Sequence, residues 1–381
     1  MKDPNLRLIL DKIQPDIFTV NEIANNETIH QHLLDENLNR DGINEFKKAD
    51  FSPVASSNIG NMLFYDSRKL ILKNQYVAQS TLRDIDVYEL YYNSNDLEQG
   101  DTAFIVCVVA HLKAGQTESD RQMRELMVNN TMQFLEPKYA HENVMFMGDF
   151  NFYSGYEPGF QLMLNYPNPE MRFLDPIGQI GDWHENSFYA GIHTQSTHTS
   201  ATSGCPAGGG MDDRFDFIMI SDEIRFGTNH VRYVQDSYYA FGQDGLRFNG
   251  AINDPPANAV VSPEVADALH IVSDHLPVVL KLRVDKVLST AENLYKPFMT
   301  KLSPQPAVDK LRISFHQPSG SLMEFTLFDG PGRRLIHEHL DIGAGKQSHE
   351  IDVSMLPAGM YFLQLQNAKG LHELVKVVIA K

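Results

Sequence analysis

The chain has 381 residues, of which 42% are hydrophobic and 21% charged, and this composition is typical of an ordinary globular protein and excludes a largely disordered one. The length exceeds the size at which a single hydrophobic core keeps growing, so two domains are expected. A net charge of -17 at pH 7 argues against a protein that holds nucleic acid mainly through a broad basic face, but a nuclease with a local basic patch and a divalent metal stays open.

The sequence contains no signal for membrane insertion or for a disulfide framework. No run of about 18 apolar residues occurs, which argues against a transmembrane helix. The first five residues lead into a polar helix rather than into the apolar segment of a signal peptide. Only two cysteines are present, and Cys107 lies within an apolar run, where it is expected to be a small buried hydrophobic residue.

The first predicted elements are a helix and a strand that ends on a carboxylate. Residues 5–13 place apolar side chains at positions 6, 9, 10 and 13, which is the spacing of one helix face. Pro15 ends this helix, and residues 16–21 are predicted to form the first strand. Glu22 follows directly and is either a solvated acid or a metal ligand, since a hard carboxylate oxygen suits Mg²⁺ or Mn²⁺.

Further strands then lead to a histidine and to a long helix. Residues 61–65 and 87–92 are predicted to be neighbouring strands, and Arg83 between them is either a phosphate ligand or an exposed edge arginine. The apolar run 104–109 predicts a strand that leads to His111, whose side chain titrates near neutral pH. Residues 120–135 have the pattern of a helix that covers the sheet.

The apolar run 144–147 predicts a buried strand that leads directly into Gly148 and two polar residues. Asp149 and Asn151 alternate across Phe150, so both polar side chains leave the same face of the pleat while Phe150 points into the core. A phosphoryl group under attack needs a base or metal to activate the nucleophile and a donor to meet charge on the phosphate oxygens. This carboxylate and amide therefore form a candidate catalytic pair.

Two more acids and a histidine lie in the last third of this region. The apolar stretch 214–221 sets Asp216 inside a predicted strand, and Asp274 and His275 directly precede Pro277 and the predicted strand 278–282. A paired acid and imidazole can activate water for in-line attack on phosphorus without a covalent intermediate. The histidines between residues 184 and 198 and Cys205 follow no zinc-binding spacing, so a structural zinc site is not expected.

These signals, in this order, resemble the endonuclease/exonuclease/phosphatase superfamily, the fold of pancreatic-type deoxyribonuclease, abasic-site endonucleases, sphingomyelinases and inositol-polyphosphate 5-phosphatases. The resemblance implies an α/β fold over residues 1–287, a four-layer α/β/β/α sandwich of the DNase I-like type. It implies catalysis by His111, Asp149, Asn151, Asp216, Asp274 and His275 and metal binding by Glu22 and Asp274, and Arg83 and Asn151 are the candidates for substrate binding.

The resemblance also implies individual roles. Glu22 matches the metal-binding glutamate, with Mg²⁺ or Mn²⁺ as the expected cofactor. His111 matches a histidine that protonates the leaving oxygen or stabilises the transition state. His275 matches the general base or a phosphate-contacting histidine, and Asp216 matches the aspartate that orients it. Asp274 matches a carboxylate that either binds the metal or supports the histidine.

The start of the chain departs from the superfamily pattern. Members usually begin with an earlier strand that ends in an asparagine contacting metal and phosphate, whereas this chain begins with the helix at residues 5–13. We expect that strand to be missing together with a native signal peptide, which leaves the activity of this form open. Asn21 stands next to Glu22 but does not match the motif of the absent asparagine.

The last part of the chain changes character. Residues 288–306 contain several prolines and are predicted to be a linker. Residues 307–381 alternate apolar and polar side chains between glycine turns, which predicts a small all-β sandwich. The segments 328–333, 351–361 and 375–378 resemble the C-terminal sorting domain of the bacterial type IX secretion system. A generic carbohydrate- or protein-binding sandwich is the alternative.

Taken together, these features predict a secreted or surface-located, Mg²⁺-dependent phosphodiester hydrolase, with a nuclease as the first expectation. The alternatives are a phosphatase or phospholipase C-type hydrolase of a small phosphoester, and an inactive surface binding protein. An acidic groove at the site would favour a small phosphoester, and a basic rim would favour a nuclease. The expected partners are nucleic acid or a small phosphoester and the type IX secretion machinery, and the protein is expected to be a monomer.

Overall fold

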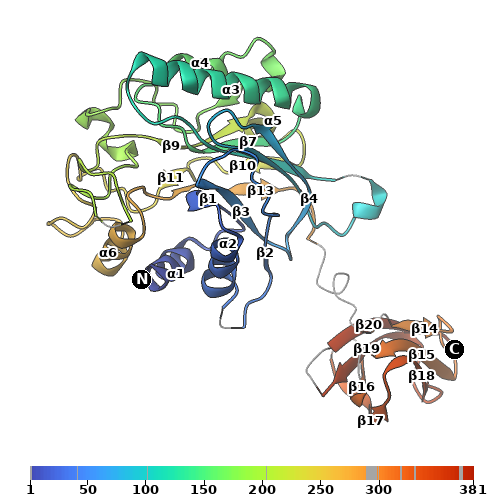
Figure 1. Ribbon diagram of the computed structural model, residues 1–381. Coiled ribbons are helices and arrows are strands. Elements are labelled where there is room, and N and C mark those ends of the chain that lie inside the picture. The colour runs from blue at the N-terminus through green and yellow to red at the C-terminus, as the bar shows by residue number, and fades with distance from the viewer. Residues whose placement is uncertain are drawn as a thin grey trace. The chain divides into compact units, whose positions relative to one another are not determined.

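The computed structural model in Figure 1 describes residues 2–40, 42–100, 102–202, 204–288, 298, 300–317, 320–329, 332–368 and 372–381. The chain divides into two compact units, Met1–Leu288 and Ser289–Lys381. Most of the predicted linker, residues 289–297 and 299, lies outside the described residues. No helix in the described part of the chain is long and apolar enough to cross a membrane.

The first unit is built on two main β-sheets. A six-stranded sheet has the order β4-β5-β6-β7-β9-β8, and a three-stranded sheet has the order β1-β3-β2. The strands of the unit are β1 (Ile17–Ala24), β2 (Phe46–Lys48), β3 (Ile59–Asp66), β4 (Leu70–Gln79), β5 (Ile85–Tyr92), β6 (Phe104–His111), β7 (Val144–Asp149), β8 (Phe173–Leu174), β9 (Asp216–Ser221), β10 (Val231–Tyr233), β11 (Tyr239–Ala240), β12 (Val278–Val279) and β13 (Leu282–Val284). The helices are α1 (Asp3–Ile13), α2 (Glu27–Leu33), α3 (Glu118–Tyr139), α4 (Pro158–Leu164), α5 (Asp222–Phe226) and α6 (Pro263–Val272), with short turns η1 (Leu34–Leu38), η2 (Leu97–Gln99), η3 (Pro169–Met171) and η4 (Ser187–Ile192).

Two hydrophobic cores show that these elements form four layers. Val106 and Val108 of β6 belong to the core between the six-stranded sheet and the helices α3 and α4. Cys107 and Val109, on the opposite face of the same strand, belong to the core between the two sheets. Helices α1 and α2 lie on the side of the three-stranded sheet away from α3 (Figure 1). The predicted four-layer α/β/β/α sandwich is therefore confirmed.

The register of the central strands brings polar residues together at one end of the sheet. Strands β6 and β7 are parallel and place His111 beside Asp149. Strands β7 and β9 are antiparallel and place Asp149 beside Asp216. Phe150 belongs to the core on the helix side and stacks on Phe217 with ring centroids 5.3 Å apart, as the alternation in the sequence predicts. The sheet therefore fixes three of the candidate residues through its backbone pairing alone.

Two strand predictions were wrong in their pairing. Residues 61–65 and 87–92 are not neighbours, because β3 pairs with β1 and β2 in one sheet while β5 pairs with β4 and β6 in the other. The strand β4, which the sequence analysis did not predict, forms the hairpin that β5 needs. The predicted strand 278–282 is divided, because β12 pairs with β11 and β13 pairs with β10.

Gly148 lets β6 and β7 approach closely just before Asp149. Its φ is +129°, and a Cβ atom at this position would lie 2.0 Å from the carbonyl oxygen of Ala110. We therefore expect Gly148→Ala to destabilise the fold by about 3 kcal/mol, because both the left-handed backbone and the clash must be relieved. Gly178→Ala is the matched control in denaturant unfolding: its φ is +67° but the space around it is open, so a loss of only about 1 kcal/mol is expected.

A buried ion pair joins the residue after β8 to the segment just before β9. The guanidinium of Arg214 donates to both carboxylate oxygens of Asp175 at 2.7 and 2.8 Å, and both side chains are buried. Arg214→Ala is expected to lower the free energy of unfolding by about 3–5 kcal/mol, because it leaves a buried carboxylate without its partner. Chemical denaturation measures this loss. As the control, Arg225→Ala removes a surface ion pair with Asp222 and is expected to lower the free energy of unfolding by less than about 0.5 kcal/mol. Equal losses for the two variants would contradict the expectation.

The second unit is a small all-β sandwich, as predicted. Its strands are β14 (Lys301–Ser303), β15 (Lys310–Gln317), β16 (Ser321–Asp329), β17 (Arg334–Ile342), β18 (Gly345–Asp352), β19 (Gly359–Asn367) and β20 (His372–Ile379). They form one sheet of order β14-β15-β18 and another of order β17-β16-β19-β20. Ile313 of the first sheet and Phe325 and Leu363 of the second share one buried core, which the alternation of apolar residues in these strands produces.

Candidate active site

Three predicted residues meet at the ends of β6 and β7 and near the end of β1. The ligand-type atoms of Glu22, His111 and Asp149 lie within 4.8 Å of one another. Nε2 of His111 lies 3.4 Å from a carboxylate oxygen of Glu22 and 3.4 Å from one of Asp149. Asp149 and His111 are buried, whereas the Glu22 side chain is 43% exposed. The group is therefore open to solvent through Glu22.

Two of the site residues adopt left-handed backbone conformations. The φ of Glu22 is +57°, and the pairing of β1 with β3 shifts register between Val20 and Ile23. The φ of Asn151 is +51°. Such conformations cost about 1–2 kcal/mol for residues other than glycine and are concentrated at functional sites. Neither conformation was predicted, because a bulge and a left-handed residue leave no simple mark in the sequence.

The electrostatic state of His111 follows from its burial. Loss of hydration, with smaller contributions from the charges of Arg83 and His275, lowers the pKa of His111 to about 3, so the ring is neutral near pH 7. Its Nδ1 is buried and finds no hydrogen-bond partner among the described residues, which fits a neutral ring with its proton on Nε2. A neutral ring can donate one hydrogen bond, which suits the predicted alternative of stabilising the transition state, and the role of His111 stays a prediction.

Asp149 is a carboxylate in an environment that opposes its charge. Burial raises the pKa of Asp149, His275 lowers it and the charges of Asp216 and Glu22 raise it, so that the pKa is about 7. Its Oδ1 accepts the backbone N–H of Asn151 at 3.0 Å. A cation bound next to Asp149 would stabilise the ionised form of this buried carboxylate.

His275 and Asp216 form the imidazole and carboxylate pair that the sequence predicts. Nδ1 of His275 lies 2.8 Å from Oδ2 of Asp216, and these two residues and Asp149 form a second group with ligand-type atoms within 4.8 Å. Burial alone would lower the pKa of His275, but Asp216, Asp149 and Asp274 together raise it to about 10. The surrounding carboxylates therefore hold this ring in its protonated form near neutral pH.

Gln195 contacts the other nitrogen of His275 and was missed by the sequence analysis. Its side-chain nitrogen lies 2.6 Å from Nε2 of His275, and the two residues also form an isolated β-bridge. Gln195 lies in the loop before β9 and belongs to no recognisable motif, so only the tertiary structure reveals it. Together, Asp216 and Gln195 fix the plane of the imidazole ring from both sides, and a protonated ring pairs with Gln195 when the amide oxygen is turned toward Nε2.

Arg83 and Asn151 lie at the rim of the same site. Nη1 of Arg83 donates to the carbonyl oxygen of Leu112 at 3.0 Å, and burial lowers its pKa while the charges of Glu22 and Asp149 raise it. The side-chain amide of Asn151 donates a long hydrogen bond of 3.4 Å to the same carbonyl. Both side chains therefore converge on the Leu112 carbonyl oxygen, and their predicted role in substrate binding stays a prediction.

Asp274 does not lie where a metal ligand was predicted. Its Oδ2 accepts the backbone N–H of Ala207 at 2.8 Å, and it belongs to neither of the two groups described above. The prediction of metal binding by Asp274 is therefore not supported by the geometry, because its carboxylate is used to fix the loop around Ala207. Its charge does reach His275 and helps to raise the pKa of that ring, which fits the alternative supporting role.

The donor set around Asp149 fits a hard divalent cation. Glu22 and Asp149 supply carboxylate oxygens, which are the ligands that Mg²⁺ and Mn²⁺ prefer. Burial raises the pKa of Asp149, and the charges of Asp216 and Glu22 add to this effect. The chain thus provides a candidate metal site, with Glu22 and Asp149 as the residues that would hold the ion.

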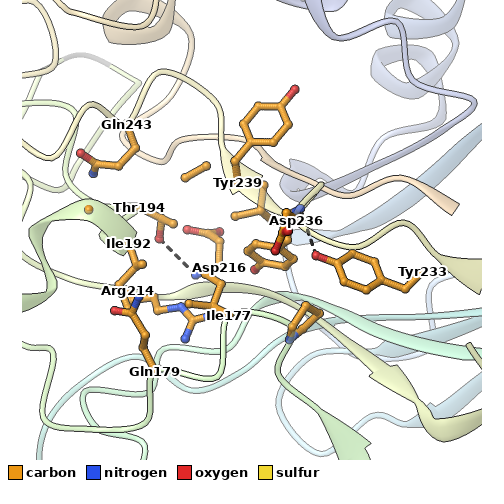
Figure 2. Close-up of a pocket in the computed structure, with 15 residues that line it drawn as sticks. Ile177, Gln179, Ile192, Thr194, Arg214, Asp216, Tyr233, Asp236, Tyr239 and Gln243 are labelled. Carbon is orange, nitrogen blue, oxygen red and sulfur yellow. Dashed lines mark hydrogen bonds between the residues drawn. The ribbon is translucent and has the colours of Figure 1, made fainter. Parts of the chain in front are cut away.

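A cavity of about 340 Å³ opens beside Asp216 (Figure 2). Three tyrosines, Tyr233, Tyr238 and Tyr239, contribute to its wall, and Asp236 adds a second carboxylate. Arg214 is the only cation among the lining residues, all of which the structure describes, and its charge is taken up by Asp175. The cavity is therefore aromatic and mildly acidic, and it adjoins the imidazole and carboxylate pair through Asp216.

Comparison with known proteins identifies the second unit. Residues 301–380 match the family described as the secretion system C-terminal sorting domain. The predicted sorting domain is thus confirmed, and it indicates a secreted or cell-surface protein. No curated protein matches the sequence.

Solved structures also resemble the chain. A humanized TDP2 of D. rerio with 14 mutations is 13% identical, with a TM-score of 0.46, and the match covers 74% of this chain and 91% of that one. An endonuclease/exonuclease/phosphatase from Beutenbergia cavernae is 14% identical, with a TM-score of 0.41 and coverage of 98% and 94%. The human Nocturnin catalytic domain with bound sulfate is 16% identical, with a TM-score of 0.42 and coverage of 74% and 86%. Because all three TM-scores are below 0.5, the chemistry of the site is argued from the geometry described above.

Proposed function

We propose that the unit Met1–Leu288 is a divalent-metal-dependent phosphodiester hydrolase that is exported by means of its C-terminal sorting domain. One observation carries this proposal: the group of Glu22, His111 and Asp149 and the group of Asp149, Asp216 and His275 share Asp149. A candidate cation position and an oriented imidazole therefore face the same small volume. That combination suits in-line displacement at phosphorus. In this reaction the negative charge on the phosphoryl oxygens must be neutralised close to a side chain that can donate or accept a proton.

The chain's own residues have separable tasks in this proposal. Asp216 and Gln195 orient His275, whose protonated ring donates a hydrogen bond to a phosphate oxygen and stabilises the charge that develops there. Asn151 and Arg83 supply donors for the phosphate oxygens. A Mg²⁺ held by Glu22 and Asp149 would polarise the phosphoryl oxygen and offset the carboxylate charge.

The cavity next to Asp216 favours a small phosphodiester over nucleic acid. A nuclease needs several cations along the path of its polyanionic substrate. The cavity instead presents tyrosines and two carboxylates, and its single arginine is paired with Asp175. This corresponds to the acidic surroundings that the sequence analysis associated with a small phosphoester. A nuclease stays the second candidate because Arg83 still provides one cation at the rim.

A substrate panel tests the proposal. The full chain is incubated with bis-p-nitrophenyl phosphate, p-nitrophenyl phosphorylcholine, p-nitrophenyl phosphate, plasmid DNA and RNA, each with Mg²⁺ and with EDTA. We expect metal-dependent hydrolysis of the small diesters, with little activity on the nucleic acids. Faster cleavage of DNA or RNA would assign a nuclease. No hydrolysis of any substrate would overturn the proposal and favour an inactive surface binding protein.

A further inference from the structure

The outer face of the four-stranded sheet in the second unit carries a group of metal-ligating side chains. Strands β16 and β17 pair so that Glu324 lies opposite His339 and Thr326 lies opposite His337. His337 and His339 are two residues apart on β17 and therefore leave the same face of the strand. The ligand-type atoms of Glu324, His337 and His339 lie within 4.8 Å of one another.

Burial confirms that these side chains face away from the core. Met323 and Phe325 of β16 and Ile336 and Leu340 of β17 belong to or pack against the hydrophobic core of the sandwich. His337 and His339 alternate with the apolar residues of β17 and are exposed to solvent. An ion could therefore reach both imidazoles without any change in the fold.

The distances within the group suit a shared ion. Nδ1 of His339 lies 3.5 Å from Oε1 of Glu324, and the two imidazole rings have centroids 4.3 Å apart. Nδ1 of His337 lies 2.8 Å from the hydroxyl oxygen of Thr326. When Nδ1–H of His337 donates to this hydroxyl, Nε2 keeps its lone pair and is fixed in direction, as the outer-shell partners of metal-bound histidines do.

We propose that Glu324, His337 and His339 form a binding site for a transition-metal ion, with Zn²⁺ as the best fit. Two imidazoles and one carboxylate, with a position left for water, are a ligand set that Zn²⁺ uses, whereas Mg²⁺ and Ca²⁺ prefer oxygen ligands only. The bound ion joins β16 to β17 across the outer face of the sheet. It therefore stabilises the sorting domain, independently of any activity of the first unit.

Zinc titration of the full chain by isothermal calorimetry tests this proposal. Excess Mg²⁺ is present, and the wild-type protein is compared with the double variant His337→Ala/His339→Ala. Any Zn²⁺ bound at the candidate active site is the same in both proteins. The difference in bound Zn²⁺ therefore gives the occupancy of the proposed site. We expect the wild-type chain to bind one more equivalent of Zn²⁺ with a micromolar Kd. Thr326→Val is expected to weaken this equivalent about tenfold, because it removes the outer-shell partner of His337.

A control and a second measurement complete the test. His349→Gln removes another histidine of the same unit, which pairs with Glu338 instead, and should leave the zinc stoichiometry unchanged. Zinc should raise the unfolding temperature of the second unit in the wild-type chain and not in the double variant. Equal stoichiometry in the wild-type chain and the double variant would overturn the proposal, since Glu324 and His339 would then form only a surface ion pair.

Discussion

His275→Ala is expected to lower the turnover number by roughly 10²–10⁴-fold, the range associated with loss of a positioned group that handles protons. The ring is held at Nδ1 by Asp216 and at Nε2 by Gln195, so it is preorganised for one task. The surrounding carboxylates raise the pKa of His275 to about 10, so the ring carries a positive charge near neutral pH. Replacement by alanine removes this positive charge from the site. The fold should survive, because the sheet pairing beneath the site does not depend on this side chain.

The measurement is the steady-state rate on bis-p-nitrophenyl phosphate with saturating Mg²⁺, together with a thermal unfolding curve for each protein. His141→Ala is the matched control, since the side chain of His141 is exposed and pairs with Glu170 at the surface. It should retain full activity. Asp216→Asn should lower the turnover number nearly as much as His275→Ala does. The two residues act as a unit, so the effects of replacing them are not additive. An active His275→Ala variant would remove the imidazole from the mechanism.

Glu22→Gln is expected to abolish metal binding at the candidate active site and to lower the hydrolysis rate by roughly 10³-fold or more. Its carboxylate is the exposed member of the group with His111 and Asp149, and the neutral amide is a far weaker ligand for a hard cation. Mn²⁺ binding followed by electron paramagnetic resonance gives a readout that does not depend on turnover. Glu27→Gln, a surface residue paired with Lys48, should leave both binding and rate unchanged.

Asp149→Asn should lose Mn²⁺ binding as well, but it should make the metal-free protein more stable. Burial and the nearby acids raise the pKa of Asp149 to about 7, so the ionised form costs free energy in the folded state around neutral pH. The amide removes this cost and still accepts the N–H of Asn151 through its oxygen. A variant that bound Mn²⁺ as tightly as the wild-type chain would show that the ion lies elsewhere.

Much of the site could be predicted from the sequence because its residues follow apolar strands. Glu22, His111 and Asp149 each follow such a strand-forming run. The backbone pairing of β6, β7 and β9 then places His111 and Asp149 next to Asp216. His275 lies outside the sheet but in a compact motif. The structure places these residues together, and their roles stay predictions until activity is measured.

The features that could not be predicted depend on long-range packing. Gln195 approaches His275 across 80 positions of sequence, through a loop without regular structure. The left-handed backbone of Glu22 arises from a register shift in the pairing of β1 with β3. Asp274 stands beside His275 in sequence, yet its carboxylate is taken by the backbone of Ala207. In the fold, β4 was missed because its side chains are largely half-buried and show no clear alternation.

The most direct test of the central claim is the hydrolysis of bis-p-nitrophenyl phosphate by the full chain at increasing Mg²⁺ concentration, with and without EDTA. We predict turnover that saturates with Mg²⁺, stops in EDTA and is absent from the Glu22→Gln variant at any concentration of the metal. Turnover that persists in EDTA, or that survives in Glu22→Gln, would contradict a metal-dependent hydrolase centred on Glu22 and Asp149.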